Sequence, residues 1–469
     1  MVFSSLIFLF AYLPLTLLCY YTVPHGWRNV VLLVLSLLFY GWGEPIYVLL
    51  MILSITTAYL FGILIGHYRE QSPKWAKRTT LVSVAVNLSF LFFFKYYNFF
   101  AENLSRLPLI TLPIIEGLSL PIGISFYTFQ IISYTIDLYR GDCSLQKNYV
   151  AFGTYVTLFP QLIAGPIVRY RDIDEQLTDR RESTDDFANG VTRFCAGLAK
   201  KVLLGDALAA GYEYYRSIAV LSPTMLGAWM TVILYTLHLY YDFSGYSDMA
   251  IGLGRIFGFH FPENFNYPYI SKSITEFWRR WHISLSTWFR EYVYIPLGGN
   301  RKGRARLYCN LAIVWLLTGF WHGANWNFLL WGAYFCVILI VEKSFLLKVL
   351  ERIPALFRHL YTMLLVTIGF LIFSHTDLHA AMACLKAMLG FGVVRGTSAV
   401  VSYQFWRMFP LLLVSMIGAT PFPKKLWDRL QNRNLQSSFL RPLVSATVFL
   451  LCVAYLVDST FSPFAYTQF

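Results

Sequence analysis

Apolar stretches long enough to cross a lipid bilayer recur along the whole of this chain. A helix needs about 20 predominantly apolar residues to span the hydrocarbon core, and a helix satisfies its own backbone hydrogen bonds in lipid. Of the 469 residues, 57% are hydrophobic and 13% are charged, whereas soluble domains carry about 25% charged residues. The sequence therefore predicts an all-α polytopic membrane protein.

Short clusters of lysine and arginine separate the apolar stretches and set the expected topology. The net charge of +13 would also suit a nucleic-acid-binding protein, but no nucleic-acid motif accompanies the clusters, so we expect no nucleic-acid partner. The clusters within residues 67–78, 298–306, 343–358 and 424–433 are expected to be cytoplasmic, because basic loops stay on that side. Counting crossings from them places both termini outside.

About eleven transmembrane helices are predicted, together with re-entrant or interfacial helices. The stretch at residues 2–21 has neither a basic leader nor a small-residue cleavage signal, so we expect a retained first span. No linker and no fixed-period repeat divides residues 1–469, which are expected to form a single membrane domain. The predicted helical crossings and hairpin arms are residues 2–21, 30–40, 45–66, 81–100, 121–139, 149–170, 224–241, 307–320, 326–341, 360–373, 405–417 and 444–457.

Residues 159–166 read Phe-Pro-Gln-Leu-Ile-Ala-Gly-Pro and interrupt one of these stretches. Two prolines and a glycine are expected to break a helix at about membrane depth. Irregular backbone is tolerated there where protein buries it or where it lines a water-filled cavity. We favour a cavity wall, and an ordinary helix end at the membrane surface is the alternative.

Polar residues elsewhere favour structural roles. The charges within residues 169–186 are expected to face solvent. His238 and Asp242 are four residues apart and share a helix face, so a mutually satisfied structural pair is favoured over a catalytic one. The seven cysteines are scattered, mostly in apolar surroundings, and are expected to be reduced thiols. No Cys-His pattern accompanies them, so we expect no metal site.

The segment from Ser273 onwards carries the first of two Trp-His pairs. Ser273 and Glu276 match a capping box at a helix start. The helix that follows is predicted to continue past residue 282 as an interfacial or re-entrant helix with an aromatic and a basic face. On it, His282 lies four residues after Trp278 and is expected near the aromatic face.

The second Trp-His pair lies at the tip of a predicted hairpin. Residues 307–320 span roughly 21 Å as a helix at about 1.5 Å per residue, which is short of a core of about 30 Å. Residues 320–325 are therefore expected to lie below the outer surface, with the chain returning inward from residue 326. This predicts His322 near the middle of the membrane.

These residue types suit acyl transfer from a thioester to a hydroxyl. His322 and His282 are candidate bases, because the imidazole pKa lies near neutrality. Asn325 and nearby backbone amides are candidate donors to the oxyanion, while Trp321 and Trp278 would shape a dry passage. For any single histidine a structural hydrogen bond is favoured. Ionisable groups retained in a membrane, however, are functional candidates, and two Trp-His pairs favour that interpretation.

At these stretches the chain resembles the membrane-bound O-acyltransferase (MBOAT) family. It is most similar to the bacterial branch that O-acetylates alginate and other cell-envelope polysaccharides. The matching segments are residues 160–167, 241–250, 276–300 and 318–331, and the likeness covers nearly the whole chain.

The resemblance implies a ring of helices around a central funnel. It implies that His322 is the family's catalytic histidine and His282 its second active-site position. A cytoplasmic thioester donor, acetyl-CoA or an acyl carrier protein thioester, would meet an outer acceptor there. The implied partners are a separate extracytoplasmic transferase of serine-esterase type, a polysaccharide such as alginate and membrane lipid. The implied location is the bacterial cytoplasmic (inner) membrane.

The tail at residues 463–469 resembles the aromatic carboxy-terminal motif of this branch, with Ala465 and Thr467 departing from it. On the resemblance, Tyr466 is a candidate relay that carries the acetyl group transiently. An aromatic anchor at the membrane interface is the alternative.

Other functions stay open at this point. Within the family, D-alanyl transfer to teichoic acid from an acyl carrier protein is the main alternative, and lipid acylation is a further one. Outside it, a transporter or flippase would use Asp242 or Asp248 along its pathway, although no repeat relates two halves of the chain. An inactive scaffold for an envelope complex is the last alternative, and the presence of both histidines disfavours it.

Overall fold

The computed structural model describes residues 2–108, 110–163, 165–433 and 437–458. Every element named in these residues is a helix, so the predicted all-α class is confirmed. The chain forms two compact units. The first holds the described residues of Met1–Phe194 and Ser247–Pro262, and the second those of Cys195–Tyr246 and Glu263–Ala465.

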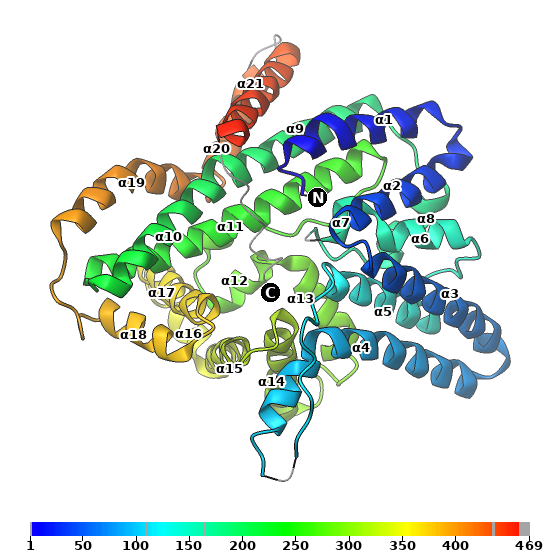
Figure 1. The fold of residues 1–469 in the computed structure, drawn as a ribbon, viewed down its shortest axis with the longest axis horizontal. Helices are drawn as coiled ribbons and strands as arrows, with labels where there is room; N and C mark the ends of the chain where they lie inside the picture. The colour runs from blue at the N-terminus through cyan, green and yellow to red at the C-terminus, as the bar shows by residue number, and fades with distance from the viewer. Residues whose placement is uncertain (1, 109, 164, 434–436, 459–469) are drawn as a thin grey trace. The chain divides into compact units, whose positions relative to one another are not determined.

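The first unit contains a long helical hairpin, in which α3 (Tyr47–Gln71) and α4 (Pro73–Leu104) run side by side (blue in Figure 1) against α5 (Ile124–Arg140). Two helices, α9 (Thr184–Ala199) and α11 (Met225–Ile256), contribute residues to both units. The remaining helices of the first unit are η1 (Phe8–Tyr12), α1 (Leu13–Thr22), η2 (His25–Trp27), α2 (Arg28–Gly43), α6 (Tyr149–Thr157), α7 (Phe159–Leu162) and α8 (Tyr170–Thr178).

The second unit holds the segment with both Trp-His pairs. Its helices are η3 (Lys200–Gly205), α10 (Asp206–Leu221), η4 (Pro268–Ile270), α12 (Ile274–Arg280), α13 (Ile283–Phe289), η5 (Arg290–Tyr294), α14 (Gly303–His322), α15 (Trp326–Val341), η6 (Glu342–Leu346), α16 (Leu347–Leu350), α17 (Ala355–Ser374), α18 (Leu378–Met388), α19 (Ala399–Gly418), α20 (Phe422–Arg433) and α21 (Ser437–Asp458).

Among the described residues, five helices are long and apolar enough to cross a membrane. They are α3, α4, α17, α19 and residues 440–458 of α21. Each covers one of the predicted crossings, so the multi-pass character of the chain is confirmed. The total of about eleven transmembrane helices stays a prediction, as does the single-domain organisation.

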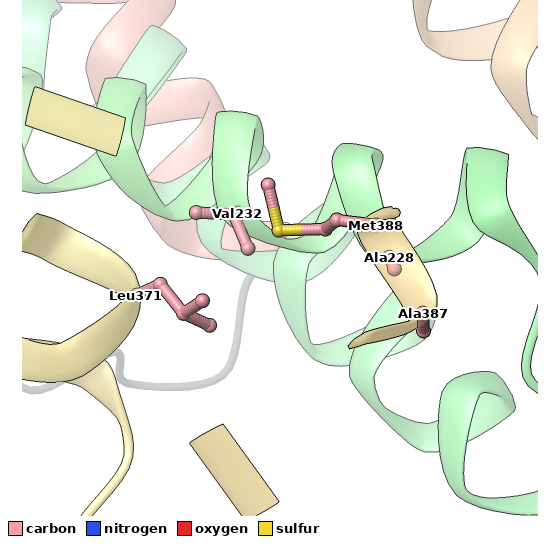
Figure 2. Packing of buried hydrophobic residues seen from close by; sticks show 5 residues of the cluster. All are labelled: Ala228, Val232, Leu371, Ala387 and Met388. Carbon is pink, nitrogen blue, oxygen red and sulfur yellow. The ribbon is translucent and has the colours of Figure 1, made fainter. Parts of the chain in front are cut away.

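Helix α11 is longer than the predicted crossing at residues 224–241, because it continues without a break through the Tyr-Asp-Phe-Ser-Gly segment. Its first turns help to form a buried core in the second unit (Figure 2). Ala228 and Val232 of α11 contact Leu371 of α17 and Ala387 and Met388 of α18. Burial of such side chains from water stabilises the fold by about 25 cal/mol per Å² of apolar surface.

The predicted pairing of His238 with Asp242 is wrong. His238 Nδ1–H donates to the carbonyl of Gly205 at 2.9 Å, and Asp242 forms an ion pair with Lys201 at 2.7 Å. Lys201 also bonds Asp206 at 2.5 Å. The π-helix η3 supplies the carbonyl of Gly205 and the side chain of Lys201. Each side chain therefore has a structural partner outside its own helix.

Two other expectations concern the first unit. The predicted break at residues 159–166 is confirmed, since α6 ends at Thr157 and α7 is a single short turn. Its role as a cavity wall stays a prediction. The expectation that all charges of residues 169–186 face solvent is wrong for Arg180. That side chain is 3% exposed and donates to the Tyr20 hydroxyl at 2.8 Å and to Asn29 Oδ1 at 2.7 Å, so long-range partners compensate its burial.

Candidate active site

Helix α12 begins at a local cap. The hydroxyl of Ser273 accepts the N–H of Glu276 at 3.0 Å, as a capping box requires. The carboxylate of Glu276 accepts the N–H of Lys272 at 2.9 Å, one residue before the Ser273 N–H that the reciprocal bond of a capping box uses. The predicted helix start is therefore confirmed.

The prediction of one continuous helix through residue 282 is wrong. Helix α12 ends at Arg280, and His282 takes a left-handed conformation with φ 45° and ψ 55° before α13 begins. The carbonyl of Arg280 accepts the N–H of Asn266 at 2.9 Å, and the N–H of Ile283 donates to the carbonyl of Asn264 at 2.9 Å. These long-range bonds replace helical ones. A left-handed residue other than glycine is uncommon and typical of functional sites.

Asn264 also orients the His282 ring. The Nδ1–H of His282 donates to Asn264 Oδ1 at 3.0 Å, and the Ser284 hydroxyl donates to the same oxygen at 2.8 Å. An amide oxygen only accepts, so the proton of neutral His282 lies on Nδ1 and the lone pair on Nε2. His282 is 1% exposed. The turn thus holds one tautomer of a buried imidazole.

Two glycines bring the arms of the hairpin into close contact. A Cβ on Gly319 would lie 2.3 Å from the carbonyl oxygen of Phe328, and one on Gly332 would lie 2.4 Å from that of Trp315. Small residues allow such an approach of two helices. The predicted hairpin is confirmed, with α14 and α15 as its arms.

The predicted shortness of the outgoing arm is wrong. Helix α14 has 20 residues and spans about 30 Å, because Arg304 and Arg306 lie within its first turns rather than in a preceding loop. The position of His322 near the middle of the membrane stays a prediction.

His322 is the last residue of α14 and lies among aromatic rings. The ring centroids of Trp331 and Phe373 lie 5.0 and 5.3 Å from that of His322, each edge-on. Trp321 lies 5.1 Å from His322 and 6.2 Å from His282. His322 is 5% exposed, so packing by rings restricts the imidazole and excludes most water.

Both histidines line one cavity of about 240 Å³ in the second unit. Its walls include Trp278, Trp315 and Phe289, and three cationic side chains also line it, Arg279, Arg290 and Lys343. A mostly apolar pocket with a few converging polar groups is typical of a binding or active site. Burial lowers the pKa of Lys343, with the charge of Arg279 acting in the same direction and Glu342 opposing them.

The structure brings some of the predicted residues together and separates others. Trp278 lines the cavity, and among the described residues its buried indole N–H has no hydrogen-bond acceptor. Trp321 contacts both histidines without lining the cavity, and Asn325 lies outside the lining, at the start of α15. Tyr466 lies outside the described residues.

Sequence reasoning missed Asn264 and the cationic side of the cavity. Asn264 lies eighteen residues before its partner His282, and no periodic pattern links them. Arg279 and Arg290 belong to the basic face predicted for the helix after Ser273, and Lys343 belongs to the predicted cytoplasmic cluster at residues 343–358. The spacing of arginines around a Trp-His pair is the signal that would have suggested anion binding there.

The fold and the site define a class, a multi-pass helical membrane enzyme with two histidines in one cavity. The membrane-bound O-acyltransferase family model matches residues 36–376. The chain is 40% identical to the probable alginate O-acetylase of Pseudomonas putida, with 100% of each chain covered. It is 35% identical to the peptidoglycan O-acetyltransferase of Helicobacter pylori, over 83% of this chain and 80% of that one.

A more distant similarity joins the chain to the teichoic acid D-alanyltransferase of Bacillus subtilis, at 31% identity over 48% of this chain and 59% of that one. The chain belongs to the membrane-bound O-acyltransferase family, in its alginate O-acetyltransferase branch. It is therefore an O-acyltransferase, as the sequence predicted.

Proposed function

We propose that this enzyme moves an acetyl group from cytoplasmic acetyl-CoA, through the membrane, towards an extracytoplasmic polysaccharide such as alginate. The main support for the proposal is that both histidines and three cationic side chains line the same cavity. A base suits proton removal from a hydroxyl, and the cations suit an anionic donor.

In the proposed reaction His322 is the base. Its imidazole takes the proton of the acceptor hydroxyl as the hydroxyl oxygen bonds to the thioester carbonyl carbon. The carbon–sulfur bond then breaks, and the imidazolium returns the proton to the thiolate of CoA. His282, which Asn264 holds with the lone pair on Nε2, positions the hydroxyl or the tetrahedral intermediate. The indole N–H of Trp278 is a donor for the carbonyl oxygen.

Arg279, Arg290 and Lys343 are proposed to bind the phosphates of CoA. Guanidinium groups bind phosphate oxygens through paired hydrogen bonds, and an ammonium group acts as a point charge. An acyl carrier protein also carries its thioester on a phosphopantetheine arm, so the same three residues suit the alternative donor.

Delivery is proposed to continue outside the cytoplasmic (inner) membrane of a bacterium, with both termini extracytoplasmic. Tyr466 would accept the acetyl group on its phenolic oxygen and pass it to a separate transferase of serine-esterase type. Tyr466→Phe lacks that oxygen and should abolish acetylation of the polymer. Full polymer acetylation by this variant would reject the relay and leave Tyr466 as an interface anchor.

The decisive experiment uses the full-length chain in lipid nanodiscs with radiolabelled acetyl-CoA. Label should appear on the protein or on an added hydroxyl acceptor, and His322→Ala should abolish it. His379→Ala removes an exposed histidine of α18 and serves as the matched control. Label from a D-alanyl carrier protein, with none from acetyl-CoA, would favour teichoic acid D-alanylation instead.

A transporter would behave differently in reconstituted vesicles. The two aspartates assigned to its pathway are ion-paired, Asp242 with Lys201 at 2.7 Å and Asp248 with Arg193 at 2.6 Å, which favours structural roles for them. Acetyl transfer that persists without a proton gradient and disappears in His322→Ala supports the enzyme. Flux that depends on the gradient and survives that substitution supports the transporter.

A further inference from the structure

Glu342 follows directly after α15, and its side chain is fully buried at 0% exposure. Its carboxylate accepts hydrogen bonds from the first two backbone amides of α12, Ile274 N–H at 2.7 Å and Thr275 N–H at 2.8 Å. The hydroxyls of Thr275 and Tyr361 donate to it at 2.7 and 3.2 Å. Four donors therefore compensate the burial of this carboxylate.

Helix α12 thus has two kinds of cap at its start. Ser273 is local, since its hydroxyl accepts the Glu276 N–H within the same segment. Glu342 reaches the helix from the end of α15. Helix α15 is one arm of the hairpin, and the other arm, α14, ends at His322. Of these two caps, Glu342 is therefore the one that connects α12 to the hairpin.

A second contact fixes the same two helices one turn further along. The ring of Trp278 lies 5.4 Å from that of Trp331 and 4.9 Å from that of Phe335, both on α15. Trp331 in turn lies 5.0 Å from His322. Helix α12 is consequently held to α15 by the hydrogen bonds of Glu342 at its start and by aromatic packing near its middle.

We infer that Glu342 is a positioning residue for acyl transfer, an inference that rests on the proposed function. Its carboxylate sets the position of α12 relative to the hairpin, and so the separation of His282, just beyond the end of α12, from His322, at the end of α14. Glu342 does not line the cavity, whereas its neighbour Lys343 and its partner Thr275 do. It therefore acts through the elements that carry the reacting groups.

Glu342→Gln tests this, because it keeps the size of the side chain and turns one acceptor oxygen into an NH₂ group facing amide donors. In the full-length chain in nanodiscs, kcat for transfer from acetyl-CoA should fall about tenfold or more, with KM changed less than about threefold, because misplacing reacting groups slows the chemical step. Ser273→Ala removes a cap from the same helix and keeps the connection to the hairpin. Its kcat should stay within about twofold of the original.

Hydrogen exchange supplies a readout that does not require activity. In Glu342→Gln, amides from residue 274 up to and including the His282 turn should exchange faster. In Ser273→Ala, only amides in the first turn of α12 should do so. A kcat for Glu342→Gln no lower than that of Ser273→Ala, or unchanged exchange at the turn, overturns the inference. If the unaltered enzyme transfers no acetyl group, the proposed function fails, while exchange still decides whether Glu342 holds α12.

A milder substitution decides the matter should Glu342→Gln not accumulate in the membrane. Tyr361→Phe removes one hydroxyl donor to the carboxylate and leaves Glu342 in place. Its kcat should fall about two- to threefold, because one of the four hydrogen bonds to the carboxylate is lost. Where Glu342→Gln does accumulate, the losses in Glu342→Gln/Tyr361→Phe should be less than multiplicative, since both substitutions act through the same group. An unchanged kcat in Tyr361→Phe overturns the inference.

Discussion

The two histidines of the cavity are held in opposite ways. His282 lies in a left-handed turn and is oriented by a hydrogen bond to Asn264, whereas His322 ends a helix and is enclosed by the rings of Trp321, Trp331 and Phe373. The hydrogen bond to Asn264 selects one tautomer of His282, and the surrounding rings restrict the position of the His322 imidazole. In the proposed reaction His322 gains and loses the proton, and His282 is the oriented partner.

The largest effect is expected at the base. His322→Ala should lower kcat for acetyl transfer about 10³-fold, because a positioned general base contributes about 10²–10⁴-fold. Steady-state transfer from acetyl-CoA measures it, with His379→Ala as the exposed control. Less than a tenfold loss would assign the proton transfer to another residue.

A smaller effect is expected at the oriented partner. His282→Ala should lower kcat about 10²-fold, because it removes hydrogen bonding in the transition state without removing the base. Measuring both alanine variants and the double variant tests whether the residues act as a unit. Equal losses in the two single variants would contradict the division of roles.

The bond that orients His282 should matter less than the ring itself. Asn264→Ala should lower kcat about tenfold, because the imidazole then samples both tautomers and other orientations. Ser284→Ala removes the other side chain on the same amide oxygen and is the matched control, expected within about twofold. Similar kcat values for the two variants would show that Asn264 stabilises only the turn.

The smallest effect is expected at the cationic side of the cavity. Lys343→Gln should raise KM for acetyl-CoA about fivefold, through loss of one charge-assisted bond, while Lys343→Arg should change it little. Burial, followed by the charge of Arg279, lowers the pKa of Lys343. Its ammonium form is therefore lost at a lower pH than in an ordinary lysine, and KM should rise as pH increases through that pKa.

The arginine variant provides the control for this pH dependence, because a guanidinium stays charged throughout. Lys343→Arg should show a flatter profile of KM against pH than the original enzyme. Identical profiles would place the titrating group elsewhere, on the donor or on another residue.

Much of the fold followed from local patterns in the sequence. Apolar runs predicted the five long apolar helices, and the Ser273–Glu276 spacing predicted the start of α12. Where a prediction was wrong, long-range partners were the reason. Backbone hydrogen bonds to Asn264 and Asn266 end the expected continuous helix. Asp242 forms an ion pair with Lys201 of η3 and not with His238.

The sequence by itself determined the membrane class and the hairpin, and it singled out the two histidines as candidate site residues. Hydrophobic periodicity and motif spacing are local properties of the chain. Only the tertiary structure decided that His282 lies in a turn, that Asn264 orients it and that Glu342 reaches α12. Those features depend on hydrogen bonds between residues 18 and 68 positions apart, and no local pattern encodes such separations.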